Sequence, residues 1–124
     1  MKLKNILGLV VSALVLSGCA QVPLEHREPF KVVEVNLPSK QLYEKLIAHP
    51  YCGSFFVVRG QYDKSDQSFV IRYNTSGFFE YPADIVEGEA VGAGKTKLIM
   101  RSVEKWQAPI SQKSLTRAQT GRCE

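Results

Sequence analysis

The chain has 124 residues, of which 16 are Lys or Arg and 12 are Asp or Glu, giving a net charge of +4. This length suits one globular domain with a single core and is too short for two domains. The basic and acidic residues are interleaved along the chain without a basic stripe, which argues against nucleic acid as a partner.

The first residues have the layout of a secretory signal peptide. Lys2 and Lys4 form a positive n-region, residues 6–16 form an apolar h-region, and the small pair Ser17-Gly18 precedes Cys19. The apolar run is about half the ~20 residues that a membrane-spanning helix needs. The sequence therefore predicts a cleaved export signal, not a transmembrane anchor. An ordinary cleaved signal with an incidental Cys19 is the alternative.

The tetrapeptide Leu16-Ser17-Gly18-Cys19 resembles the lipobox of bacterial lipoproteins. In that family the Cys is thioether-linked to diacylglycerol, the peptide before it is removed, and the new amino terminus is acylated, for example with palmitate. The resemblance implies that residues 1–18 are a signal peptide and that Cys19 is the lipid anchor. In lipoproteins of enteric-type bacteria an Asp after the Cys favours the inner membrane, and Ala20 stands there in this chain. We therefore expect an outer-membrane anchor, with the domain facing the periplasm.

Two thiols remain when Cys19 is assigned to lipid, and we predict that they form a disulfide. An exported domain meets an oxidising compartment, where a Cys52–Cys123 bond would persist. Closing a loop of about 70 residues contributes on the order of 4 kcal/mol to stability. The alternatives are two buried free thiols, or a metal site that also uses His49. Because the ligand spacing is not that of a zinc site, we expect neither a metal nor another cofactor.

The mature chain begins with an expected linker, followed by a strand and a helix. Residues 20–29 lack apolar periodicity, so we expect an extended linker in which His26 is solvated. Phe30–Leu37 alternates in hydrophobicity and predicts a strand. Ser39–Ala48 has apolar residues at helical spacing, with Ser39 as a candidate N-cap, and His49-Pro50 ends it.

Two hairpins follow in the sequence. Phe55–Tyr62 and Gln67–Asn74 flank a polar turn, and Ile85–Val91 and Lys97–Val103 flank a glycine turn. A shorter strand is expected over Phe78–Tyr81, stopped by Pro82. The predicted fold class is α+β, a mostly antiparallel sheet of five or six strands packed on one amphipathic helix, in a single domain over residues 30–124.

The carboxyl-terminal part contains an aromatic residue and a possible second helix. Trp106 follows the last predicted strand, where we expect a core or edge-capping residue. Ser111–Gln119 can form a short helix with Leu115 and Ala118 on one side, and Gly121 is a C-terminal stop.

No pattern in the sequence predicts an enzyme. A nucleophilic triad needs a His oriented by a carboxylate beside Ser or Cys, and both His residues lie in the expected linker or at a helix end. Asp84, Glu87 and Glu89 are interpreted as a solvated acidic face of a strand, not as paired catalytic carboxylates. Gly94-Lys95-Thr96 is similar to the end of a phosphate-binding loop, but Glu89 stands where its first Gly is required. We expect no bound nucleotide.

The mature region also resembles the small uncharacterised lipoproteins of Gram-negative bacteria, a likeness that implies no activity. Ser76-Gly77 and Tyr81 resemble a loop of the membrane-bound lysozyme inhibitors, and Tyr51-Cys52 resembles their early Tyr-x-Cys. The chain departs from that family: no residue separates Tyr51 from Cys52, the Ser-Gly pair is not repeated, and the expected helix does not belong in its barrel.

The predicted function is that of a non-catalytic outer-membrane lipoprotein that binds another envelope component through protein contacts. A lysozyme inhibitor and a surface-exclusion or phage-immunity lipoprotein are the alternatives. The candidate binding residues are Ser76, Gly77, Tyr81 and Trp106.

Overall fold

A computed structural model of the protein describes residues 23–48, 56–76, 78–103 and 109–122. Along the chain the elements are the 3₁₀ helix η1 (Leu24–His26), β1 (Lys31–Val35), α2 (Ser39–Ala48), β2 (Phe56–Asp63), β3 (Ser68–Thr75), β4 (Pro82–Gly92), β5 (Lys95–Ser102) and α3 (Ile110–Thr120). None of the helices in these ranges is long and apolar enough to cross a membrane.

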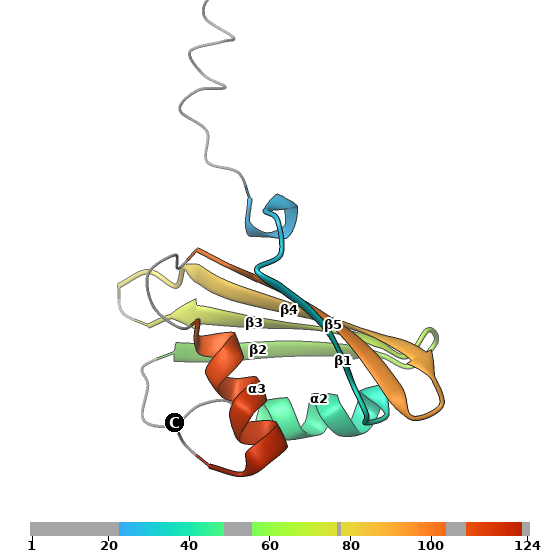
Figure 1. Ribbon diagram of the computed structural model, residues 1–124. Helices are drawn as coiled ribbons and strands as arrows, with labels where there is room; N and C mark the ends of the chain where they lie inside the picture. Colours follow the sequence, from blue (N-terminus) through green and yellow to red (C-terminus); the bar gives the residue numbers. More distant parts are fainter. Residues whose placement is uncertain (1–22, 49–55, 77, 104–108, 123–124) are drawn as a thin grey trace, which may run out of the picture.

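The five strands form one antiparallel sheet in the order β1-β5-β4-β3-β2. Strands β2 to β5 follow one another as a meander, and β1 pairs with β5 at one edge. Figure 1 shows both helices on one face of this sheet and η1 on the opposite face. The predicted α+β class, with an antiparallel sheet packed on an amphipathic helix, is confirmed.

The core lies between the sheet and the helices. Strand residues that alternate along the sheet pack against Leu42 and Leu46 of α2 and against Leu115 of α3. These residues recur at helical spacing in α2 and at period two in the strands, so each element buries one face. The buried sheet residues include Phe69, Ile71, Tyr73, Val86, Leu98 and Met100.

Two glycines let large side chains approach the sheet. A Cβ at Gly60 of β2 would lie 2.5 Å from Cδ1 of Ile47, which belongs to α2. A Cβ at Gly88 of β4 would lie 2.2 Å from the ring of Phe69 on the neighbouring strand. Both distances are far below van der Waals contact, so a side chain at Gly88 would clash with the ring of Phe69, and one at Gly60 would displace the ends of the α2 side chains.

Both predicted helices are present. α2 covers the predicted range Ser39–Ala48, and α3 extends the expected Ser111–Gln119 by one residue at each end. Gly121 ends α3 with a left-handed backbone (φ 74°), and its N–H donates to the carbonyl of Arg117 at 2.7 Å. This is the αL cap for which glycine is favoured.

The strand predicted over Phe78–Tyr81 is wrong. These residues belong to the connection between β3 and β4, and β4 begins at Pro82. The carbonyl of Tyr81 accepts a hydrogen bond from the N–H of Thr75 at 2.7 Å, which closes the connection into a loop. Proline suits the first residue of a strand because it has no N–H to donate. The described part of the chain therefore has five strands, not six.

The segment expected to be an extended linker folds onto the sheet between Leu24 and Arg27. It forms η1, and the Leu24 side chain is buried. η1 contacts β4 and β5 on the face opposite the helices, and Ile85 of β4, which points to that face, is also buried. Burial of these two apolar side chains stabilises the turn. His26 is exposed, as the sequence predicts.

Candidate functional site

The loop between β3 and β4 carries three exposed aromatic side chains, Phe78, Phe79 and Tyr81, which we call the aromatic loop. Phe78 is fully exposed, and Phe79 and Tyr81 are 67% and 60% exposed. The rings of Phe79 and Tyr81 lie 6.1 Å apart, tilted by 56°. Large apolar side chains that gather on one protruding loop mark an interaction site more often than singly scattered ones.

Polar contacts hold the base of the aromatic loop. The N–H of Tyr81 donates to Oγ1 of Thr75 at 3.1 Å, beside the backbone bond between the same two residues. Arg59 of β2 donates to both carboxylate oxygens of Glu80, at 3.0 and 3.2 Å. These hydrogen bonds from Arg59 lower the pKa of Glu80, so the pair stays ionised at neutral pH. These contacts fix the backbone at Tyr81 and the side chain of Glu80, while the aromatic rings remain exposed to solvent.

The structure places two of the four candidate binding residues in this loop. Ser76 and Tyr81 are both exposed there, whereas Gly77 and Trp106 lie outside the described residues. Phe78 and Phe79 are not among the candidates because their sequence predicts a strand, whereas the structure places both on the exposed loop. Successive side chains of a strand point to opposite faces of the sheet, so only one of two adjacent aromatic residues can be buried when one face is exposed. The pair Phe78-Phe79 therefore indicates at least one exposed ring.

A second polar cluster lies inside the molecule, and it corrects the interpretation of Asp84 as part of a solvated acidic face. Asp84 is fully buried. Its Oδ1 accepts a hydrogen bond from Oγ of Ser102 at 2.5 Å, and its Oδ2 accepts one from the backbone N–H of Ser111 at 2.7 Å. Pro109, which precedes α3, has no side chain that can cap the helix. Asp84 therefore caps α3 from another element, where the helix dipole also favours a carboxylate.

The hydroxyl groups beside Asp84 are enclosed by protein. Tyr73, Ser111 and Ser114 have buried side-chain hydroxyls without a well-formed hydrogen bond in the part of the chain that is described. Burial raises the pKa of Tyr73 above its usual range, and the nearby charge of Asp84 acts in the same direction, so Tyr73 is neutral. Because Tyr73 and Asp84 have no exposed surface, this cluster is a structural junction and not a substrate site.

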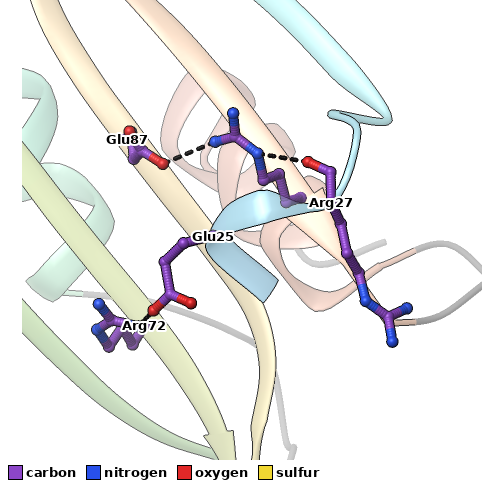
Figure 2. A network of polar contacts seen from close by, with 5 residues as sticks. Glu25, Arg27, Arg72 and Glu87 are labelled. Atoms are coloured by element: carbon purple, nitrogen blue, oxygen red, sulfur yellow. Dashed lines mark hydrogen bonds and ion pairs between the residues drawn. The ribbon is translucent and has the colours of Figure 1, made fainter. Parts of the chain in front are cut away.

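The other two acids of β4 lie on the sheet face opposite the helices. Glu87 is half-buried and accepts a hydrogen bond from Arg101 of β5 at 2.7 Å, whereas Glu89 is exposed. Arg101 also donates to the backbone carbonyl of Arg27 at 2.7 Å, and Arg72 of β3 pairs with Glu25 (Figure 2). Polar contacts from two strands therefore hold the segment around η1 on this face.

Other kinds of site have less support in the structure. An open groove of about 630 Å³ lies between α2 and α3, and its lining includes Glu44, Lys45 and Arg117. Among the described residues no group of three His, Cys, Asp or Glu side chains is placed to hold a metal ion. The predicted lipidation site Cys19 and the predicted disulfide partners Cys52 and Cys123 lie outside the described residues.

The aromatic loop thus gathers the three most exposed large hydrophobic side chains of the described residues. Comparison of the chain with protein-family models, with curated protein sequences and with solved structures found no match.

Proposed function

We propose that the protein is a non-catalytic lipoprotein, anchored in the outer membrane through Cys19, whose aromatic loop binds another component of the cell envelope. The exposure of Phe78, Phe79 and Tyr81 is the observation that supports a binding role. Phe and Tyr side chains bring large apolar area to a contact at a low cost in conformational entropy. The resemblance of Leu16-Ser17-Gly18-Cys19 to a lipobox supports the anchor.

Three carboxylates on β4 and on the aromatic loop are engaged in structural contacts, which supports a binding role over a catalytic one at these positions. Asp84 is enclosed and caps α3, Glu87 pairs with Arg101, and Glu80 pairs with Arg59. Each of these carboxylates is thus engaged in a contact that supports the fold or the loop. General acid or base catalysis needs a carboxylate within reach of a substrate and with a suitably tuned pKa.

Site-specific photo-crosslinking in living cells tests the binding role. A benzophenone amino acid in place of Phe78 is expected to give an adduct with an envelope component, because this side chain is fully exposed at the loop. The matched control carries the same probe in place of Val91, which is 43% exposed at the other end of β4. Protein adducts are detected as gel shifts and lipid adducts by intact mass.

The outcome at the two positions decides the proposal. An adduct at position 78 and none at position 91 supports binding through the aromatic loop. Equal labelling at both positions, or labelling at neither, contradicts it. A lysozyme adduct at position 78 would favour the alternative of a lysozyme inhibitor, in which Ser76 and Tyr81 belong to the contact.

A further inference from the structure

The aromatic loop and the amino-terminal segment lie at the same end of the sheet. Glu25 pairs with Arg72, and the carbonyl of Arg27 accepts a hydrogen bond from Arg101. Arg72 precedes the end of β3 at Thr75 by only three residues, a distance of about 10 Å along a strand. The described chain therefore begins close to the strand ends that carry the aromatic loop.

The proposed anchor leaves little freedom between this end of the sheet and a bilayer. Four residue steps separate Cys19 from Pro23, where the described chain begins. Fully extended, they span about 14 Å at most. Because Leu24 is buried and Glu25 is paired with Arg72, the segment around η1 is part of the folded domain and does not lengthen the connection to Cys19. A lipid on Cys19 would therefore keep the strand ends near the membrane surface.

The composition of the aromatic loop suits the interface of a bilayer. Tyr is enriched where a membrane meets water, since its ring is apolar and its hydroxyl is polar. Phe78 and Phe79 offer apolar rings, and the pairing of Glu80 with Arg59 compensates the acid that would otherwise be repelled by anionic lipid.

The loop fits a bilayer better than a protein surface. A stable protein interface buries about 800 Å² on each partner around a central cluster. Here the rings stand on one narrow loop whose neighbours Ser76 and Glu80 are exposed and polar. A tethered loop also meets the membrane at high effective concentration, so a small apolar contact is sufficient.

We propose that the component bound by the aromatic loop is the lipid bilayer itself, with Phe78 and Phe79 inserted among the headgroups and Tyr81 at the surface. This inference rests on the proposed lipid anchor and names the partner of the same site. The loop then acts as a second membrane contact, and together with the anchor it sets the orientation of the domain.

Tryptophan quenching in vesicles tests this orientation. The full lipidated protein is purified with Trp106→Phe and either F78W or V91W, and is reconstituted into phosphatidylethanolamine and phosphatidylglycerol vesicles that carry bromine on their acyl chains. Val91 is the matched control because it lies nine residue steps along β4 from Pro82, a distance of about 30 Å. We expect strong quenching and a blue shift for F78W, and neither for V91W.

Flotation of the same vesicles separates failure of the anchor from failure of the insertion. If the protein does not float with the vesicles, the proposed anchor is wrong, and the inference that depends on it is overturned too. If it floats but F78W emission is as unaffected as V91W emission, the insertion is wrong and the anchor stands. If the Trp106→Phe variants do not fold, the benzophenone amino acid is placed at position 78 or 91 of the protein that keeps Trp106, and crosslinking in vesicles replaces the fluorescence measurement. A phospholipid adduct in vesicles at position 78 alone supports insertion, and its absence overturns it.

Discussion

The carboxylate of Asp84 joins three elements at one end of the sheet. Asp84 lies on β4, opposite Tyr73 of β3 and Ser102 of β5 in the sheet. Its carboxylate contacts Ser102 of β5 and caps the first turn of α3. A fully buried carboxylate is tolerated where its oxygens accept hydrogen bonds, and both oxygens of Asp84 do so. Without this side chain the N–H of Ser111 would be buried without a partner.

Replacing Asp84 is therefore expected to destabilise the fold. Asp84→Ala leaves the N–H of Ser111 and the hydroxyl of Ser102 without their acceptor, at a cost of about 1–3 kcal/mol in the free energy of unfolding. Urea denaturation measures the change. Glu89→Ala on the same strand is the control, because Glu89 is exposed and its removal should change stability by less than about 0.5 kcal/mol. Equal stability of the two variants would contradict a structural role for Asp84.

At the scale of elements, η1 and the residues after it form a clasp on the sheet, defined as Leu24–Arg27. An apolar contact and two polar ones hold it: burial of Leu24, pairing of Glu25 with Arg72, and the bond from Arg101 to the carbonyl of Arg27. Figure 2 shows that the polar contacts of the clasp come from different strands. The clasp therefore sets where the amino-terminal segment leaves the domain.

Acid is expected to loosen the clasp. The hydrogen bond from Arg72 lowers the pKa of Glu25 in the folded protein. The ion pair therefore stabilises the folded protein fully at a pH above the ordinary carboxyl pKa. This stabilisation is lost as the pH falls through the lowered pKa of Glu25. Both side chains are 41% exposed, so the effect is small, as for surface ion pairs of about 0.2–1 kcal/mol. Hydrogen exchange of the His26 and Arg27 amides measures it.

Three variants separate the charge from the packing in the clasp. At neutral pH, Glu25→Gln should exchange these amides a few-fold faster than the wild type, and the difference should vanish in acid, where Glu25 is protonated. Glu34→Gln, on the exposed face of β1, should have no effect. Leu24→Ala should speed exchange at every pH, because the apolar contact does not titrate. A pH-independent effect of Glu25→Gln would contradict the ion pair.

At the scale of the whole molecule, the two faces of the sheet have different coverings. The helices cover one face of the sheet, the clasp crosses the other, and the aromatic loop projects from the end of the sheet (Figure 1). The order of the strands brings the ends of β3 and β5 and the starts of β1 and β4 to this end. Through this topology the clasp and the aromatic loop, distant in the sequence, lie toward the same end of the sheet.

The intact mass of the purified protein tests the proposed anchor and the predicted disulfide together. We expect the chain from Cys19 to Glu124 with the mass of diacylglycerol and one further acyl chain added, and two hydrogens fewer than the reduced form. Cys19→Ser should remove the lipid mass. Cys52→Ser should remove the bridge and lower stability by on the order of 4 kcal/mol. Labelling of Cys52 by a thiol reagent in the native protein would disprove the disulfide.

Local patterns in the sequence were sufficient for most elements of the fold. The helical spacing in Ser39–Ala48, the period-two strands and the stop at Gly121 act over a few residues, so their prediction did not need the tertiary structure. The lipobox resemblance is likewise a local pattern. The expected anchor, the disulfide and the role of Trp106 stay predictions, since their residues lie outside those described.

The tertiary structure alone decided the surroundings of Asp84, Leu24 and the aromatic loop. The burial of Asp84 does not follow from its local sequence, because its partners Ser102 and Ser111 lie 18 and 27 residues further along the chain. The local sequence around Leu24 predicts a linker, because β4 and β5, which bury this side chain, are remote in the sequence. Phe78 and Phe79 have high strand propensity, yet the contacts between Thr75 and Tyr81 close a loop. Local propensity describes what a segment prefers, whereas burial depends on which distant segments meet it.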